Sequence, residues 1–272
     1  MAATPVLIVV GDIHCGSTFA LCPPDFATYD GHSFGLSRTQ QWIWECWRHF
    51  CDSWVPHVTR GRPYALVLMG DLVEGAHHRN GPEIFHADPG VHAKAAVHCL
   101  LPLAEGAERV FVVRGTECHV GSAEAGIGER LGAEVDPATG EHSAFWWRLE
   151  HNGTLMVFRH HIGTTARASL EATQLSIVLA EEQVQAARVG APVPKVVCRA
   201  HRHVMGDWSD GNGLVVVGPS WQVHTSHAHK VVPSARTQIG AYALDFDGVP
   251  AGGLPLLKRS LYTPTPMEAT KL

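Results

Sequence analysis

Histidine and acidic residues cluster in five short segments of the sequence. These segments are Asp12-Ile13-His14, Asp71-Leu72-Val73-Glu74, Glu117-Cys118-His119, His160-His161 and His201-Arg202-His203. Residues i and i+2 of an extended segment face the same side, so the Asp-x-His and His-x-His pairs can each direct two side chains into one site. Mixed imidazole and carboxylate ligands are typical of Zn, Mn, Fe or Ni. The pattern therefore predicts a site for such metals.

Seven of these side chains are candidate ligands when the pair at 160 and 161 supplies only one. They are Asp12, His14, Asp71, Glu117, His160, His201 and His203. Seven ligands are too many for one tetrahedral ion and suit two divalent ions that share a carboxylate, for which we expect Asp71. His160 and His161 remain alternatives, and we prefer His160 because it comes directly after a predicted strand. Mn²⁺ is the expected ion, with Zn, Fe or Ni as alternatives.

Each segment follows an apolar run that is typical of a buried strand. The runs at 6–10, 65–69 and 110–113 end at polar residues, which predicts strands of one central sheet. Open α/β sheets place their ligands beyond the carboxyl ends of such strands. The remaining expected elements are a hairpin with an Asn-Gly turn at 145–158, strands at 195–199, 214–218 and 239–246, and helices at 37–55, 91–105, 122–131 and 166–189. The predicted class is therefore α/β.

The overall composition limits the class of protein. The chain has 272 residues, of which 45% are hydrophobic and 17% charged, so it can bury a core and is not largely disordered. With 21 Lys and Arg against 26 Asp and Glu, its net charge of −5 argues against wrapping duplex DNA by charge alone. No apolar run approaches the roughly 18 residues of a membrane span. The N-terminal ten residues lack the basic residues of a signal peptide, so we expect a cytoplasmic protein.

The order of the five segments resembles that of the calcineurin-like metallophosphoesterases. The family blocks D-x-H, G-D-x-x-D/E, G-N-H-D/E, H and G-H-x-H read here as Gly11-Asp12-Ile13-His14, Gly70-Asp71-Leu72-Val73-Glu74, Gly115-Thr116-Glu117-Cys118-His119, His160-His161 and Ala200-His201-Arg202-His203. The resemblance spans residues 6–203 and implies a two-sheet β-sandwich flanked by helices, with the metals at the rim of the sheets. The segment 12–24 is also similar to the phage and prophage branch of this family.

The third block departs from the family pattern. The family has an Asn there that binds the second metal, whereas this chain has Thr116 followed by Glu117. We expect Glu117 to be the replacement ligand, because an anionic oxygen binds a cation better than a hydroxyl does. His119 then corresponds to the family's catalytic His, one residue further along. Alternatively, the loop supplies no ligand.

The resemblance implies a metal-dependent phosphoester hydrolase in which metal-activated water attacks phosphorus. We favour a phosphodiesterase, because an alkoxide leaving group needs an acid and His119 can supply one. A nuclease that acts on DNA ends or single strands is one alternative, and a non-catalytic scaffold with the same fold is another. The expected partner is a phosphoester substrate, which includes nucleotides and nucleic acids. We expect no binding to a membrane.

Loops next to the predicted ligands are expected to select the substrate. We expect one domain at 1–263, with loop insertions at about 15–36 and 75–90 and a tail at 264–272. His77 and His78 lie in the second insertion and are the candidate substrate contacts. The sequence leaves the oligomeric state open.

Overall fold

The first of two sheets carries the N-terminal strands of the chain. In this computed structural model, residues 6–24, 26–27, 31, 33–77, 81–163, 170–231 and 238–264 are described. Strands β1 (Val6–Val10), β2 (Tyr64–Leu68) and β3 (Arg109–Val112) pair in parallel, and β9 (Ile239–Asp245) and β10 (Leu256–Tyr262) extend the sheet antiparallel on the other side of β1. The strand order is β10-β9-β1-β2-β3. Every residue of β1 and β2 is buried, as their continuous apolar runs predict.

The second sheet has the order β4-β5-β6-β8-β7. Strands β5 (Thr154–Arg159), β6 (Val196–Arg199) and β8 (Leu214–Val217) are parallel at its centre, and β4 (Trp146–His151) and β7 (Gly206–Ser209) are antiparallel at its edges. The β4–β5 hairpin turns at Asn152-Gly153, where both residues have positive φ, as a tight Asn-Gly turn requires.

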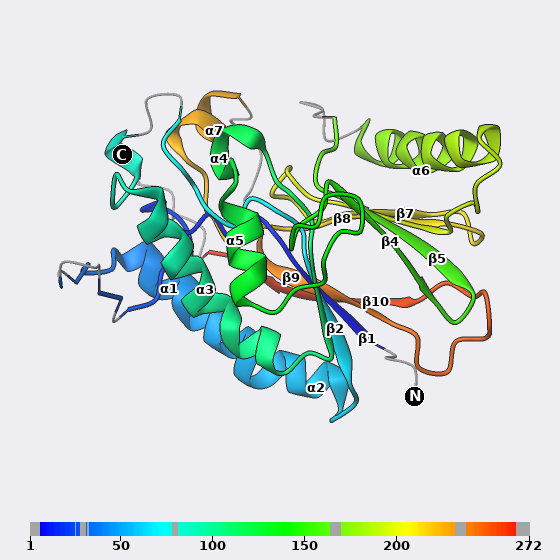
Figure 1. The fold of residues 1–272 in the computed structure, drawn as a ribbon, viewed down its shortest axis with the longest axis horizontal. Helices are drawn as coiled ribbons and strands as arrows, with labels where there is room; N and C mark the ends of the chain where they lie inside the picture. The colour runs from blue at the N-terminus through cyan, green and yellow to red at the C-terminus, as the bar shows by residue number, and fades with distance from the viewer. Residues whose placement is uncertain are drawn as a thin grey trace, which may run out of the picture.

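Three separate apolar clusters hold four layers together. Side chains such as Leu7, Val67 and Phe158 pack between the two sheets. On the outer face of the first sheet lie α1 (Arg38–His49), α3 (Pro89–Glu105) and α5 (Ala123–Arg130), and the second sheet is covered by α6 (Glu171–Arg188). Figure 1 shows α6 over the strands of the second sheet and the other three helices beside the first sheet. This arrangement confirms the expected α/β sandwich of two sheets flanked by helices.

Several elements differ from the sequence predictions in extent. The first helix begins at its expected N-cap, Ser37, whose hydroxyl accepts a hydrogen bond from the Gln40 amide. It continues past residue 55 through a π-helical turn (η1, Phe50–Trp54) into α2 (Val55–Thr59), which ends at Arg60 with positive φ. The short elements α4 (Glu117–Val120), η2 (Gly81–Glu83), α7 (Ser226–Val231), β7 and β10 were not predicted.

The three apolar runs that were predicted to share one sheet do so, as β1, β2 and β3. The strands that precede His160 and His201 belong to the second sheet, so the predicted ligands do not all follow strands of one sheet. The two-sheet architecture implied by the family resemblance is therefore the right one. The proposed domain limits stay a prediction, and His78 and residues 265–272 lie outside the described part of the chain. No helix among the described residues is long and apolar enough to cross a membrane.

Candidate metal centre

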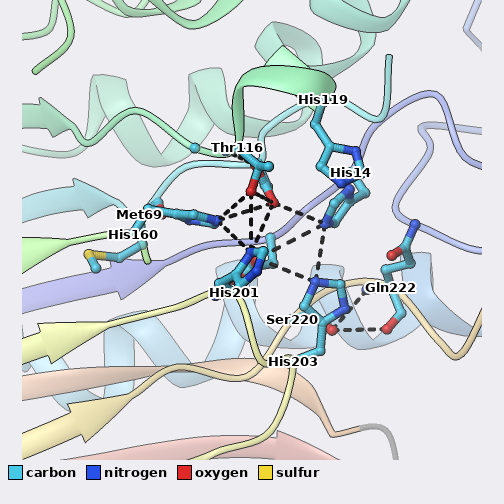
Figure 2. Close-up of polar contacts among 12 residues, drawn as sticks. His14, Met69, Thr116, His119, His160, His201, His203, Ser220 and Gln222 are labelled. Carbon is cyan, nitrogen blue, oxygen red and sulfur yellow. Dashed lines mark hydrogen bonds and ion pairs between the residues drawn. The ribbon is translucent and has the colours of Figure 1, made fainter. Parts of the chain in front are cut away.

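The predicted ligands converge where the two sheets meet at one rim. Asp12 and Asp71 follow β1 and β2 of the first sheet, whereas His160 and His201 follow β5 and β6 of the second. Figure 2 shows His14, Thr116, His160, His201 and His203 pointing toward one another. The structure thus brings together six of the seven predicted ligands: Asp12, His14, Asp71, His160, His201 and His203.

The backbone at this rim is held in an unusual conformation. Seven described residues other than glycine have positive φ, and five of them are predicted ligands: Asp12, His14, Asp71, His201 and His203. A left-handed conformation costs such residues of order 1–3 kcal/mol each, so it persists only where the surrounding structure imposes it. These left-handed conformations turn the chain after β1, β2 and β6, where the predicted ligands direct their side chains into a shared site.

The first cluster consists of Asp12, His14 and His203. Asp12 Oδ1 lies 3.3 Å from His203 Nε2 and 4.0 Å from His14 Nε2, and the two Nε2 atoms are 3.2 Å apart. Asp12 Oδ1 is buried and has no aligned hydrogen bond to any described residue. A buried carboxylate oxygen facing two imidazole nitrogens is a donor set that fits a divalent cation.

The second cluster consists of Asp71, Thr116, His160 and His201. Asp71 Oδ2 lies 3.1 Å from His160 Nε2, 3.2 Å from the Thr116 hydroxyl and 4.0 Å from His201 Nδ1. The same oxygen is 3.8 Å from His14 Nε2 of the first cluster. Asp71 therefore stands between the two clusters, in the position expected of a shared carboxylate.

Thr116, and not Glu117, reaches the second cluster. The Thr116 hydroxyl lies 3.3 Å from His160 Nε2 and 3.2 Å from His201 Nδ1. Glu117 is exposed, begins α4, and belongs to none of the described groups of side chains that could hold a metal. The structure thus does not bring Glu117 to the other six ligands. Thr116 stands at the N-cap of α4, where its backbone faces Asp71 and the next side chain turns away from the centre.

Of the two neighbouring histidines, His160 lies deeper in the site. Its side chain is buried, and its Nδ1 donates a 2.6 Å hydrogen bond to the Met69 carbonyl, which leaves Nε2 directed at Asp71. Metal-binding histidines are commonly oriented by such a bond on the other ring nitrogen. His161 is exposed, although one of its ring nitrogens lies within reach of His160 and His201.

Glu74 organises the outer side of the first cluster. One carboxylate oxygen lies 2.9 Å from His14 Nδ1 and accepts a 2.9 Å bond from Gln222 Nε2, and the other lies 3.1 Å from His77 Nε2. The Glu74 carbonyl accepts a 2.9 Å bond from His119 Nδ1. Glu74 therefore orients His14 and places the predicted substrate contact His77 beside the predicted catalytic His119, with ring centroids 4.0 Å apart. The sequence indicated Glu74 only as the last residue of the second family block, and nothing in the sequence predicted a role for Gln222.

The clustered charges shift the pKa values of these groups strongly. Burial alone lowers the pKa of His14, but Glu74, Asp71 and Asp12 outweigh it and raise the value to about 9. Burial likewise opposes protonation of His160, yet Asp71 raises its pKa to about 10. Burial opposes ionisation of Asp71, but His160 holds its pKa well below the usual range. Carboxylates that attract protons onto neighbouring histidines in this way equally attract cations, which compete with those protons.

A cavity of about 540 Å³ opens beside the metal centre. Its wall includes Gly75, Ala93, Glu117 and His119, and none of the six converging ligands. His119 therefore separates this cavity from the first cluster, where its ring lies 4.8 Å from that of His14. Burial and then the neighbouring His14 lower the pKa of His119 to about 4.

Comparison with solved structures places the chain among proteins of similar architecture. It is similar to Vps29 from Entamoeba histolytica with bound Zn²⁺ (12% identity, 88% of this chain and 85% of the other, TM-score 0.44). It is also similar to an archaeal phosphodiesterase (8% identity, 94% of this chain and 99% of the other, TM-score 0.46). A third similar structure is a predicted phosphoesterase from Streptococcus pneumoniae (14% identity, 95% of this chain and 99% of the other, TM-score 0.36). No protein-family model and no curated protein matches the sequence. At these identities and TM-scores the likenesses carry no argument about function, which depends on the geometry of the site.

Proposed function

We propose that this protein is a calcineurin-like metallophosphoesterase that hydrolyses phosphodiesters. The observation that supports the proposal most is the position of Asp71, whose Oδ2 lies 3.1 Å from His160 Nε2 and 3.8 Å from His14 Nε2. One carboxylate thereby joins two ligand clusters, which suits a pair of divalent ions. Asp12, His14 and His203 would hold the first ion, and Thr116, His160 and His201 the second, with Asp71 common to both.

The chain's own residues supply orientation and proton transfer. Bound divalent cations would stabilise the charge on the phosphate oxygens and acidify a water molecule. Glu74 keeps His14 and His119 in fixed orientations through the hydrogen-bonding contacts described above. Because His119 Nδ1 donates to a carbonyl, Nε2 is the nitrogen that exchanges a proton with substrate. We assign His119 the role of donating a proton to the leaving oxygen, and His77 the role of contacting the substrate.

Metal content and a substrate panel test this proposal. Protein purified without chelator should bind two ions per chain, with Mn²⁺ tried first and Zn²⁺, Fe²⁺ and Ni²⁺ compared. Asp71→Asn should lose both metal binding and hydrolysis of bis-p-nitrophenyl phosphate, because the shared carboxylate offsets charge on both ions. Asp52→Asn is the matched control, since Asp52 is exposed and pairs with Arg48 in the first helical region. Near-normal activity of Asp71→Asn would contradict the assignment.

The same panel separates the proposal from its alternatives. Cleavage of single-stranded DNA far faster than of the small diester would indicate a nuclease with the same chemistry. Binding of metal without hydrolysis of any monoester, diester or nucleic acid would favour the scaffold. Fewer than one ion per chain, not raised by added Mn²⁺, would contradict a two-metal centre altogether.

A further inference from the structure

Glu124 is a buried carboxylate outside the candidate metal centre. It lies in the first turn of α5, and only 1% of its surface is exposed. Glu124 forms no ion pair with any basic side chain that the structure describes, and it belongs to neither metal cluster. A buried carboxylate is costly unless it is well hydrogen-bonded, so the contacts it does make have to compensate.

Those contacts join two loops of the metal centre. Glu124 Oε1 accepts a 3.1 Å hydrogen bond from the Leu72 amide, and Oε2 accepts a 2.7 Å bond from the Gly115 amide. Leu72 directly follows Asp71 in the loop after β2, and Gly115 directly precedes Thr116 in the loop after β3. One side chain thus connects the backbone of the shared carboxylate with the backbone of the residue that replaces the family Asn.

The two loops also contact each other directly. The Thr116 amide donates a 2.6 Å bond to Asp71 Oδ1, and a Cβ atom on Gly115 would lie 2.2 Å from the Asp71 amide nitrogen. His160 and His201 also contact Asp71 and Thr116, but both are predicted ligands. Glu124 belongs to neither cluster, so its two hydrogen bonds act on the spacing of the loops whether or not an ion is bound.

We propose that Glu124 is a positioning residue that fixes the spacing of Asp71 and Thr116 and thereby the affinity of the second cluster for its ion. In its consequence for metal binding this inference rests on the proposed two-metal function. Two acceptor oxygens are required, because each loop presents an N–H group. An amide at this position would offer one acceptor and turn an NH₂ group toward the other loop.

Glu124→Gln tests the proposal by metal titration and amide hydrogen exchange. We expect the second ion to bind about 10- to 100-fold more weakly, as is typical when a supporting hydrogen bond is lost. The first ion shares Asp71 but not Thr116, so we expect its affinity to fall less. Excess Mn²⁺ should restore turnover. Burial and then the charge of Asp71 raise the pKa of Glu124 to about 7, although the hydrogen bonds from the Gly115 and Leu72 amides oppose this shift. The variant and the unmodified protein are therefore compared above pH 7, where Glu124 is ionised. Glu129→Gln, an exposed substitution on the same helix, is the matched control.

Hydrogen exchange separates this inference from the metal proposal. In Glu124→Gln without metal, the Leu72 and Gly115 amides should exchange faster than in the control, while amides of β2 and β3 keep their protection. Unchanged exchange at both amides, or unchanged affinity for both ions, would overturn the positioning role. If the unmodified protein binds no metal but these amides lose protection in the variant, the metal proposal fails and the loop spacing role stands. Glu124→Asp, which keeps the charge but is one methylene too short to reach both loops, serves if Glu124→Gln does not fold.

Discussion

At the scale of single residues, the centre is built from side chains whose neighbours leave one ligand atom available. His160 and His14 each have one ring nitrogen committed to Met69 or Glu74, and the other nitrogen directed at the carboxylates. The sequence predicts that these side chains converge, because their place just after a strand is a local property. It predicts the third block less well, since the choice between neighbouring side chains depends on where the loop turns.

Substitutions in the third block decide which residue completes the second cluster. Thr116→Asn supplies the family's amide oxygen, so we expect the second ion to bind about tenfold more tightly, equivalent to about 1.4 kcal/mol. Thr116→Val, which removes the hydroxyl but keeps the shape, should weaken the same ion. Calorimetric titration with Mn²⁺ measures both. Glu117→Gln is the internal control, because the exposed Glu117 lies apart from the cluster. A loss of metal only in Glu117→Gln would restore Glu117 as the ligand.

His119→Ala addresses proton transfer to the leaving group. If His119 protonates that oxygen, the variant should retain both ions and lose about 10²- to 10⁴-fold in turnover of diesters with alkoxide leaving groups. The loss should shrink for p-nitrophenolate, which leaves without a proton. His98→Ala, an exposed histidine of α3, is the control. Loss of metal from His119→Ala would instead make His119 a ligand.

The pH profile gives an independent check on His119. A leaving-group acid works in its protonated form, and the pKa of His119 is lowered to about 4 by burial and by His14. For alkoxide substrates, kcat/KM limited by this group should therefore fall as pH rises above about 4, once metal occupancy is held constant. The fall should be absent in His119→Ala. A profile that instead rises through this region would show that neutral His119 accepts a proton.

At the scale of elements, tight loops after parallel strands bring the ligands together. The loops after β2 and β3 cross at Gly70 and Gly115, where a Cβ atom on Gly70 would lie 2.6 Å from the Gly115 Cα. Backbones can approach this closely only where side chains are absent. The sequence shows a Gly before each of the first three ligand blocks, but not that two of these glycines touch.

Gly115→Ala should therefore disrupt the centre. Its Cβ would lie 2.2 Å from both the amide nitrogen and Oδ1 of Asp71, so one loop has to move. We expect weaker binding of both ions and a loss of about 1–3 kcal/mol in the free energy of unfolding, measured by metal titration and urea denaturation. Gly126→Ala is the matched control, because its Cβ meets open space within a helix and should be neutral or stabilising. Equal effects of the two substitutions would contradict a tight crossing at Gly115.

At the scale of the whole molecule, the metal centre exists only where both sheets pack together. Asp12, Asp71 and Thr116 come from the first sheet, whereas His160 and the His201–His203 pair come from the second. Anything that loosens the packing of either sheet should reach the centre. A buried ion pair lies at the other end of β1 from the candidate centre: on β9, which pairs with β1, Asp245 is 3.1 Å from Arg62 and 2.7 Å from Lys258.

Asp245 should make stability depend on acid pH. Burial opposes its ionisation, but hydrogen bonds from Lys258 and Arg62 lower its pKa below the ordinary value. Its contribution is therefore fully present above about pH 4, the pKa of an ordinary Asp, and is lost as pH falls through the lower folded pKa. Asp245→Asn should cost about 2 kcal/mol at neutral pH and flatten this acid dependence in urea denaturation without metal. Asp247 pairs with the same Arg62, but more than half of its side chain is exposed. Asp247→Asn should therefore lower the free energy of unfolding far less than Asp245→Asn does.

The sequence by itself determined the α/β class, the described strands other than β7 and β10, and six side chains that meet at the rim. These follow from local patterns, because apolar runs and Asp-x-His spacings fix strand ends and the direction of the side chains. Only the tertiary structure decided which strands belong to which of the two sheets, that Thr116 rather than Glu117 faces the second cluster, and that Glu124 connects two loops 52 and 9 residues away. Such contacts depend on which loops pack against each other, and no local pattern encodes that packing.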